Sequence, residues 1–320
     1  MKTNHEASSI ICIGGANVDR KFYLKHNIVN ETSNPVYSSS SVGGVARNIA
    51  ENLGRLGEEV KLMTASGYDA DWKEIAQASS PFMDLSLVTQ CEQQSTGSYT
   101  AVLDKHGDLS IAFADMDIFE SITPELLQKN KAILQNATCI VVDLNCPRET
   151  IDFLCSFTLK EQIPLVVIPV SAPKMERLPP SLSAVDWLIV NKDETETFMN
   201  MTILDQQDWK QSVKKWLDAG VKNVIVTNGS EGAMAGTENG DIYHYQAIET
   251  PTIIDVTGAG DSFCSAVIHT WLQDQTLDTI IQSGMVNAHK TIMSNETVRT
   301  DLSFDQLSED VEQINVSSNH

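Results

Sequence analysis

The chain has 320 residues, 42% of them hydrophobic and 20% charged, and carries a formal net charge of −21 at pH 7. This composition is ordinary for a globular protein with a large core, and the length alone would allow two domains. The acidic charge argues against binding a nucleic-acid backbone, and no apolar run approaches the roughly 18 residues that span a membrane. Because no secretion signal is present, we expect a cytoplasmic protein with its six cysteines reduced.

The first predicted element is a short apolar strand over residues 9–14, which runs into a turn rich in small residues. Asn17 and Asp19 follow this turn. The glycine spacing does not fit a dinucleotide-binding fingerprint, which needs a helix to open at the glycines. The simplest interpretation is a strand and a turn, with Asp19 in solvent.

A helix is predicted over residues 45–56, where apolar residues recur at helical spacing and a glycine follows. Gly43 and Gly44 precede it as a hinge. Asn48 lies in the first two turns, off the apolar side. The simplest interpretation of Asn48 is an exposed polar residue.

A small sheet outside the main layer is predicted from two separate stretches. Residues 17–42 hold β-compatible segments without helical periodicity, and residues 95–116 contain a hairpin around Gly107. The two stretches together would supply the strands of this sheet.

A short helix is predicted within residues 67–80. After residue 119, predicted strands, among them 139–143 and 165–168, alternate with predicted helices, the first of them over 123–135, which indicates a parallel sheet covered on both faces. Ligands bind such sheets at the carboxyl ends of the strands. The residues at these ends that support one shared site are Asn145, Asn191, Glu194, Thr227 and Gly229. The oxygens of Asn191 and Glu194 suit Mg²⁺, while capping of a helix by Asn191, with exposed carboxylates, is the alternative.

The strongest local signal lies in residues 252–272. Its β-branched start predicts the end of a strand or an extended loop, and an apolar stripe from Asp261 on predicts a helix. Between them, Gly258, Ala259 and Gly260 let backbone N–H groups approach an anion at a helix N-terminus. Asp261 is either a cap of this helix or a base beside the anion site.

The segment DVTGAGDSF resembles the C-terminal signature of the PfkB (ribokinase-like) carbohydrate and nucleoside kinases, and the resemblance extends over residues 10–294. It implies one α/β domain over residues 1–320, a three-layer α/β/α sandwich with a mostly parallel central sheet and a small β-sheet lid from about 17–42 and 95–116. It also implies that Asp261 is the catalytic base and that the glycine-rich turn before it is the anion hole.

The resemblance further implies a sugar site near the first strand. In the family, an aspartate after that strand binds sugar hydroxyls and a GG-x-x-x-N motif contacts the sugar. The substrate-binding residues expected here are Asp19, Asn17 as a weaker candidate, Gly43, Gly44, Asn48 and Asn145. The form GGVARNIAENLGRLG looks most like the pseudouridine kinases, and Val45-Ala46-Arg47 departs from the ribokinase pattern, which puts free ribose in doubt as the substrate.

ATP and Mg²⁺ are implied as well. An NxxE motif places Glu194 where it would position Mg²⁺ through water. The expected nucleotide-binding residues are Asn191, Thr227, Gly229, Gly232 and Asn287. The simplest interpretation of His289, near Asn287 on the same predicted helix, is a surface histidine. Many family members bind a monovalent cation such as K⁺ through the aspartate of DVTGAGD, here Asp255, although Asp255 could equally cap its loop.

We therefore expect a kinase that binds a nucleoside and ATP and forms a homodimer through its lid, with no nucleic-acid polymer or membrane as partner. Phosphorylation of the 5′-hydroxyl of pseudouridine is the favoured hypothesis. Another nucleoside or ribose kinase is the alternative within the class. A non-catalytic nucleotide- or nucleoside-binding protein on the same fold is the alternative from a different class.

Overall fold

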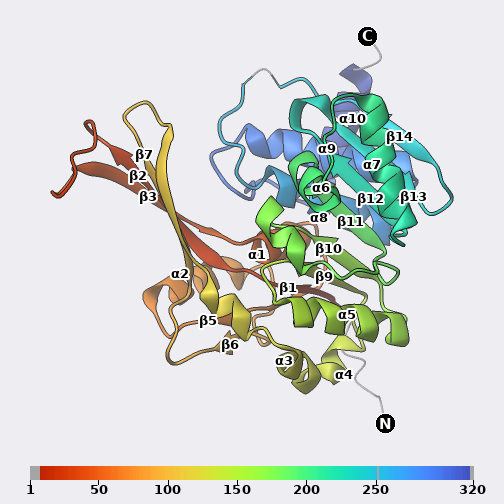
Figure 1. Ribbon diagram of the computed structural model, residues 1–320, viewed down its shortest axis with the longest axis horizontal. Helices are drawn as coiled ribbons and strands as arrows, with labels where there is room; N and C mark the ends of the chain where they lie inside the picture. Colours follow the sequence, from red (N-terminus) through yellow and green to blue (C-terminus); the bar gives the residue numbers. More distant parts are fainter. Residues whose placement is uncertain (1–7, 251, 318–320) are drawn as a thin grey trace.

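An eight-stranded sheet forms the centre of the computed structural model, which describes residues 8–250 and 252–317 (Figure 1). The strand order is β14-β13-β12-β11-β10-β9-β1-β4, and the six strands from β12 to β4 run parallel. They are β1 (Ile10–Ile13), β4 (Val60–Met63), β9 (Cys139–Asp143), β10 (Leu165–Ile168), β11 (Trp187–Asn191) and β12 (Asn223–Thr227). An antiparallel hairpin of β13 (Ala233–Thr237) and β14 (Ile242–Tyr245) completes one edge.

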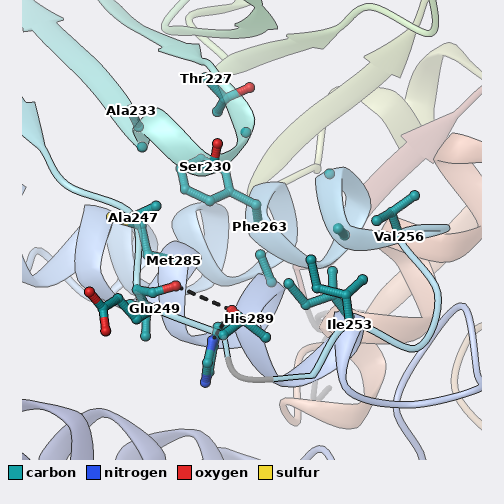
Figure 2. Close-up of a pocket in the computed structure, with 18 residues that line it drawn as sticks. Thr227, Ser230, Ala233, Ala247, Glu249, Ile253, Val256, Phe263, Met285 and His289 are labelled. Carbon is teal, nitrogen blue, oxygen red and sulfur yellow. Dashed lines mark hydrogen bonds between the residues drawn. The ribbon is translucent and has the colours of Figure 1, made fainter.

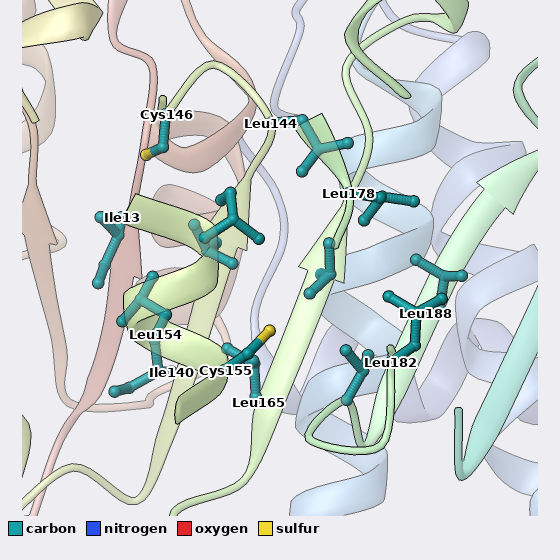
Figure 3. Packing of buried hydrophobic residues seen from close by; sticks show 14 of the residues in the cluster. Ile13, Ile140, Leu144, Cys146, Leu154, Cys155, Leu165, Leu178, Leu182 and Leu188 are labelled. Atoms are coloured by element: carbon teal, nitrogen blue, oxygen red, sulfur yellow. The ribbon is translucent and has the colours of Figure 1, made fainter. Parts of the chain in front are cut away.

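Alternate residues of the parallel strands face opposite sides of the sheet and build two cores. Ile11 and Ile13 of β1 belong to one core, part of which Figure 3 shows, and Ile10 and Cys12 belong to the other. The first core is covered by α3 (Pro124–Lys129), α4 (Lys131–Leu134), α5 (Arg148–Glu161) and α7 (Gln206–Asp218). The second is covered by α1 (Val45–Arg55), α8 (Ala259–Leu272) and α9 (Leu277–Ile292). Helices on both faces explain why these strands are largely apolar, and they confirm the predicted sandwich.

A second sheet, called the lid sheet below, projects from the sandwich as an arm (Figure 1). Its strands, in the order β3-β2-β7-β8, are β2 (Asn17–Leu24), β3 (Val36–Gly43), β7 (Gly97–Leu103) and β8 (Leu109–Asp115). They fall within the two stretches predicted from the sequence, except that β3 runs one residue further, to Gly43. The hairpin of β7 and β8 turns at Gly107, whose φ of 90° favours glycine.

Several elements differ from the sequence prediction. The helix predicted at residues 123–135 is two helices, because the chain leaves helical geometry at Asn130. For residues 252–256, the structure has the extended loop and not the strand, the other of the two predicted alternatives. The sequence prediction did not assign the β13–β14 hairpin, α6 (Lys192–Met199) or α10 (Phe304–Ser317). The short helix predicted within 67–80 is α2 (Ala70–Ser79). The two-residue strands β5 (Ala65–Ser66) and β6 (Thr89–Gln90) precede and follow it in the chain and pair with each other.

None of the helices within the described ranges is long and apolar enough to cross a membrane.

Candidate active site

Asp261 lies in the first turn of α8, and its carboxylate is bonded to helix α1. Asn48 Nδ2 donates a hydrogen bond to Asp261 Oδ2 at 2.8 Å, although the two residues are 213 positions apart in the chain. Gly258, with a φ of 80°, is the N-cap residue of α8, and no side chain of the described residues caps this helix end. Asp261 is therefore not the N-cap of α8, although it is an acidic residue in the first turn of this helix.

The environment of Asp261 makes it a weak acid. Burial raises its pKa to about 7, and the nearby charges of Asp143 and Asp19 act in the same direction. The hydrogen bond from Asn48 and the charge of Arg47 oppose this rise. A carboxylate with a pKa near neutrality is suited to accept a proton at physiological pH.

Arg47 fixes the orientation of the Asn48 amide. Its Nη1 donates to Asn48 Oδ1 at 3.1 Å, so that the Nδ2 end turns toward Asp261. The guanidinium is itself held by an ion pair with Glu51 and by a hydrogen bond from Nε to Ser79 Oγ at 3.1 Å. Asn48 is only 4% exposed, so its interpretation as an exposed polar residue is wrong. The GG-x-x-x-N asparagine thus contacts the candidate base directly.

Asn17 and Asp19 form a polar pair at the start of lid strand β2. Asn17 Nδ2 donates to Asp19 Oδ1 at 2.7 Å, and Asp19 Oδ2 has no hydrogen-bond partner among the described residues. Asp19 is half-buried, so its placement in solvent is wrong, and burial raises its pKa. A Cβ at Gly43 would overlap Asp19 Oδ2. Glycine at this position therefore leaves an acceptor oxygen open to a ligand.

Asp143 is a buried carboxylate that the sequence prediction noted only as the end of a strand. It is 1% exposed and accepts hydrogen bonds from Gly15 N at 2.9 Å, Ala46 N at 3.0 Å and Asn145 N at 2.9 Å. The Asn145 side chain donates to it as well, at 3.3 Å. One carboxylate thus joins the loop after β1, the start of α1 and the end of β9. The only sequence signal for this role of Asp143 was its position as a polar residue at the end of an otherwise apolar strand.

Gly44 allows the loop after β1 and the start of α1 to approach closely. Its φ is 102°, and an added Cβ would overlap Gly15 O. Gly44 has this packing role, whereas Gly43 borders Asp19 directly. Asn145 is buried, and its Nδ2 would overlap a Cβ placed on Gly15. These residues of the predicted substrate site are therefore brought together around Asp143.

The glycine-rich turn before Asp261 presents free backbone donors. Among the described residues, the N–H groups of Gly260 and Asp261 have no hydrogen-bond partner, whereas Ala259 N donates to Val256 O at 3.3 Å. A Cβ on Gly260 would stand in open space, and a Cβ on Gly258 would overlap Thr297 O. The turn thus has two free N–H groups at the positive end of a helix dipole, as an anion site requires.

A cavity of about 550 Å³ adjoins this turn (Figure 2). Thr227, at the carboxyl end of β12, and Gly260, at the start of α8, both line it, so the cavity lies at the edge of the sheet where the sequence places a site. Gly229 and Gly232, two of the expected nucleotide-binding residues, also line it. Most of its remaining wall is apolar, with Phe263 of α8 among the lining side chains.

The predicted nucleotide role of Asn287 does not fit its position. Asn287 is fully buried, its Nδ2 donates to Ser262 O at 2.8 Å, and it does not line the cavity. His289, two residues further along α9, lines the cavity instead, and its Nδ1 lies 2.8 Å from Thr250 Oγ1 (Figure 2). Residues two apart project from different faces of a helix, so one of the pair packs inside while the other borders the cavity.

Asn191 and Glu194 form a capping box at the start of α6. Asn191 Oδ1 accepts from Glu194 N at 2.8 Å, and Glu194 Oε2 accepts from Asn191 N at 2.8 Å. The capping alternative predicted exposed carboxylates, but Glu194 is only 4% exposed. Burial raises the pKa of its carboxyl group. Its Oε1 has no hydrogen-bond partner among the described residues, so one hard oxygen remains for an ion or a water. Neither residue lines the cavity.

Asp255 is bonded on both carboxylate oxygens. Oδ1 accepts from Thr257 N at 2.9 Å and from Thr257 Oγ1 at 2.6 Å, which agrees with its interpretation as a loop cap. Oδ2 accepts from Nζ of Lys21, a residue of lid strand β2, at 2.8 Å. Burial opposes ionisation of Asp255, but these contacts outweigh it and hold its pKa at about 2.

A family model described as pfkB family carbohydrate kinase matches residues 7–301. The chain belongs to this family. The pseudouridine kinase of Escherichia coli (strain K12) is 27% identical to it over 302 residues, which cover 93% of this chain and 95% of the relative. The chain is thus a sugar or nucleoside kinase of the PfkB family.

Solved structures confirm the ribokinase-like fold. A carbohydrate kinase from Agrobacterium tumefaciens is 28% identical and superposes with a TM-score of 0.80, covering 95% of this chain and 97% of that chain. The ribokinase of Arabidopsis thaliana, solved with ribose and ATP, superposes with a TM-score of 0.85 over 96% of this chain and 99% of that chain. At 18% identity, this second likeness concerns the fold alone.

Proposed function

We propose that this kinase transfers the γ-phosphoryl group of ATP to the 5′-hydroxyl of pseudouridine, giving ADP and pseudouridine 5′-phosphate. The observation that carries the proposal is the contact between Asn48 and Asp261. It holds a carboxylate with a pKa of about 7 at the mouth of a turn with free N–H groups, beside a cavity of about 550 Å³.

In the proposed reaction, the 5′-oxygen of the nucleoside attacks the γ-phosphorus, the bond from phosphorus to the β–γ bridging oxygen breaks, and Asp261 takes the hydroxyl proton. A carboxylate suffices as the base because little proton transfer is needed until late in a loose transition state. The N–H groups of Gly260 and Asp261 would stabilise the charge on the transferring group. Ala259 N contributes less than the sequence suggests, since it already has a backbone partner.

The ribose would lie against the lid sheet. Asp19 Oδ2 is free to accept hydrogen bonds from ribose hydroxyls, and such charge-assisted bonds are strong. Asn145 and the second N–H of the Asn48 amide would border the same region. The Asn145 side chain is placed there by its hydrogen bond to Asp143, and the Asn48 side chain by its hydrogen bond to Asp261. The form GGVARN and the likeness to the Escherichia coli pseudouridine kinase support pseudouridine over ribose.

ATP would lie in the cavity, with its phosphates at Thr227, Gly229 and the start of α8. Glu194 would hold Mg²⁺ through water by its free Oε1, which fits the preference of this ion for hard oxygens. Bound Mg²⁺ supplies neutralisation of phosphate charge. The capping box meanwhile fixes the Glu194 side chain by its other oxygen.

The proposal includes a homodimer formed through the lid sheet. Leu109, Ile111 and Phe113 alternate along β8, so they share one face, and each is at least 45% exposed. Such a stripe on an outer strand is a surface that a second copy could cover. Light scattering of Ile111→Asp should show a monomer where the unchanged protein is a dimer.

The decisive test is an ADP-release assay over pseudouridine, uridine, inosine, adenosine and ribose with the same preparation. We expect the highest kcat/KM for pseudouridine. If pseudouridine ranks among the poor substrates, the substrate assignment is wrong while the kinase assignment stands. ATP binding without turnover of any of the five compounds would favour a binding protein on this fold.

A further inference from the structure

The lid sheet reaches the anion turn through one cation, Lys21. Residues at alternate positions of a strand face the same side, so Lys21 shares the face of β2 that carries Asn17 and Asp19. Its Nζ lies 2.8 Å from Asp255 Oδ2, and the two residues are 234 positions apart. Asp255 stands three residues before Gly258, the N-cap of α8. A side chain of the lid therefore contacts the loop that leads into the turn before Asp261.

This ion pair stays charged at any physiological pH. The pKa of Asp255 is about 2, as described above. Burial lowers the pKa of Lys21, but its contacts with Asp255 outweigh burial and raise it. The other Asp255 oxygen is occupied by Thr257, whose backbone directly precedes Gly258. The lysine, the aspartate and Thr257 are thus joined by hydrogen bonds, and Thr257 is the residue directly before the turn.

A monovalent cation does not fit beside this pair. The resemblance to PfkB kinases would place K⁺ on Asp255, yet the ammonium of Lys21 already neutralises this carboxylate. A second cation on the same carboxylate would lie close to a like charge and be repelled. The side chain of Lys21 is 31% exposed and that of Asp255 33%, so solvent screens the repulsion only in part.

We propose that the Lys21 ammonium takes the place of a monovalent cation at Asp255, so that this kinase orders its anion turn without K⁺. The inference rests on the proposed phosphoryl transfer at Asp261. It makes Lys21 a positioning residue, because it acts on the reacting group only through Asp255 and the turn. It also makes order in the turn depend on the lid, since the cation comes from β2.

The test compares the unchanged protein with Lys21→Met in KCl and in choline chloride of equal ionic strength. The unchanged protein should show the same kcat in both salts. Lys21→Met should lose roughly 10- to 100-fold in kcat in choline chloride, the range for loss of a charged hydrogen bond. Added KCl should restore much of that activity in a saturable way. Lys21→Arg should remain active without K⁺.

Lys25→Met is the matched control, because Lys25 is a lysine of the same lid region whose Nζ lies over the Tyr37 ring and not on a carboxylate. It should behave like the unchanged protein in both salts. A second measurement needs no substrate. The melting temperature of Lys21→Met should rise in KCl relative to choline chloride, while that of the unchanged protein should not. Lys21→Gln serves the same purpose if the methionine variant folds poorly.

Three results would overturn the proposal: activation of the unchanged protein by KCl over choline chloride, full activity of Lys21→Met in choline chloride, or a defect of Lys21→Met that no concentration of KCl relieves. Failure of the proposed function would look different. No variant would then phosphorylate a nucleoside in either salt, while the melting temperatures would still decide whether Lys21 excludes K⁺.

Discussion

The two sides of the candidate site are built by different means. On the proposed substrate side, side chains hold one another by hydrogen bonds: Asn17 to Asp19, and Arg47 to Asn48, which also donates to Asp261. On the proposed nucleotide side, glycine turns and apolar side chains such as Phe263 enclose a cavity. The acceptor side is thus pre-organised by a polar network, whereas the nucleotide side offers shape and backbone donors. Loss of one polar group should therefore cost more on the acceptor side.

Asp261→Asn is the change with the largest expected effect. The amide of this variant would keep an oxygen that can accept from Asn48 but could not take the proton of the 5′-hydroxyl, so kcat should fall by roughly 10²–10⁴. The measurement is kcat beside a thermal melt of the same preparation at about pH 8, one unit above the pKa of Asp261.

The direction in which Asp261→Asn should change the melting temperature follows from the raised pKa of Asp261. Because the pKa of Asp261 is raised in the folded state, the folded protein binds this proton more tightly than the unfolded chain. Stability is therefore lost as the pH rises from the ordinary value of 3.8 through about 7, and at pH 8 the ionised carboxylate carries its full cost in stability. Asp261→Asn removes that cost, so its melting temperature should be unchanged or higher. Glu125→Gln, in the first turn of α3, is the control and should keep full activity. Full turnover by a folded Asp261→Asn protein would remove Asp261 from the mechanism.

Asp19→Ala should have the next largest effect, on nucleoside binding. Removal of this acceptor should weaken binding by about 1–3 kcal/mol, seen as a higher KM for the nucleoside, because a ribose hydroxyl would lose its partner. The KM for ATP should not change, since Asp19 does not line the cavity. Ser39→Ala, on the neighbouring lid strand, is the control. An unaltered nucleoside KM in Asp19→Ala would refute this placement of the ribose.

Glu194→Gln tests the proposed nucleotide side. We expect a smaller effect than for Asp19→Ala, seen in the Mg²⁺ requirement. Gln can still accept the hydrogen bond from Asn191 N, so the capping box should persist and the melting temperature should change little. The Mg²⁺ concentration for half-maximal activity should rise about tenfold, because the free oxygen is no longer charged. Asp193→Asn, at the neighbouring position, is the control. Wild-type Mg²⁺ dependence would mean that Glu194 serves only to cap α6.

Much of the fold follows from the sequence, because its buried strands are short, continuous apolar runs that polar turns interrupt. The prediction for β9 and β10 matches the structure residue for residue, since helices cover both sides of each strand. The β13–β14 hairpin was missed because Ala233–Thr237 is rich in small residues and not β-branched. Asn239-Gly240, with Gly240 at a φ of 85°, is the turn signal that could have revealed it.

The site was predicted less completely, because its decisive contacts join distant parts of the chain. The motifs gave the residue types of Asn48 and Asp261, but not that the two side chains bond to each other. Helical spacing placed Asn287 and His289 on one helix without telling which of them faces inward. Asp143 was overlooked because a buried carboxylate is recognised by the backbone donors around it, which only the folded chain brings together.

The pH dependence of the reaction gives the smallest and most specific effect. With Asp261 as the base, kcat/KM should fall below about pH 7, the pKa of this residue in the free enzyme, and level off above it. The hydrogen bond from Asn48 lowers that pKa, so Asn48→Ala should move the acid limb to higher pH. The charge of Asp19 raises the same pKa, so Asp19→Ala should move the limb to lower pH. The two profiles of kcat/KM, measured side by side, therefore separate a residue that stabilises the ionised base from one that opposes its ionisation. An acid limb at the same pH in Asn48→Ala and the unchanged protein would show that the contact seen here does not tune the base.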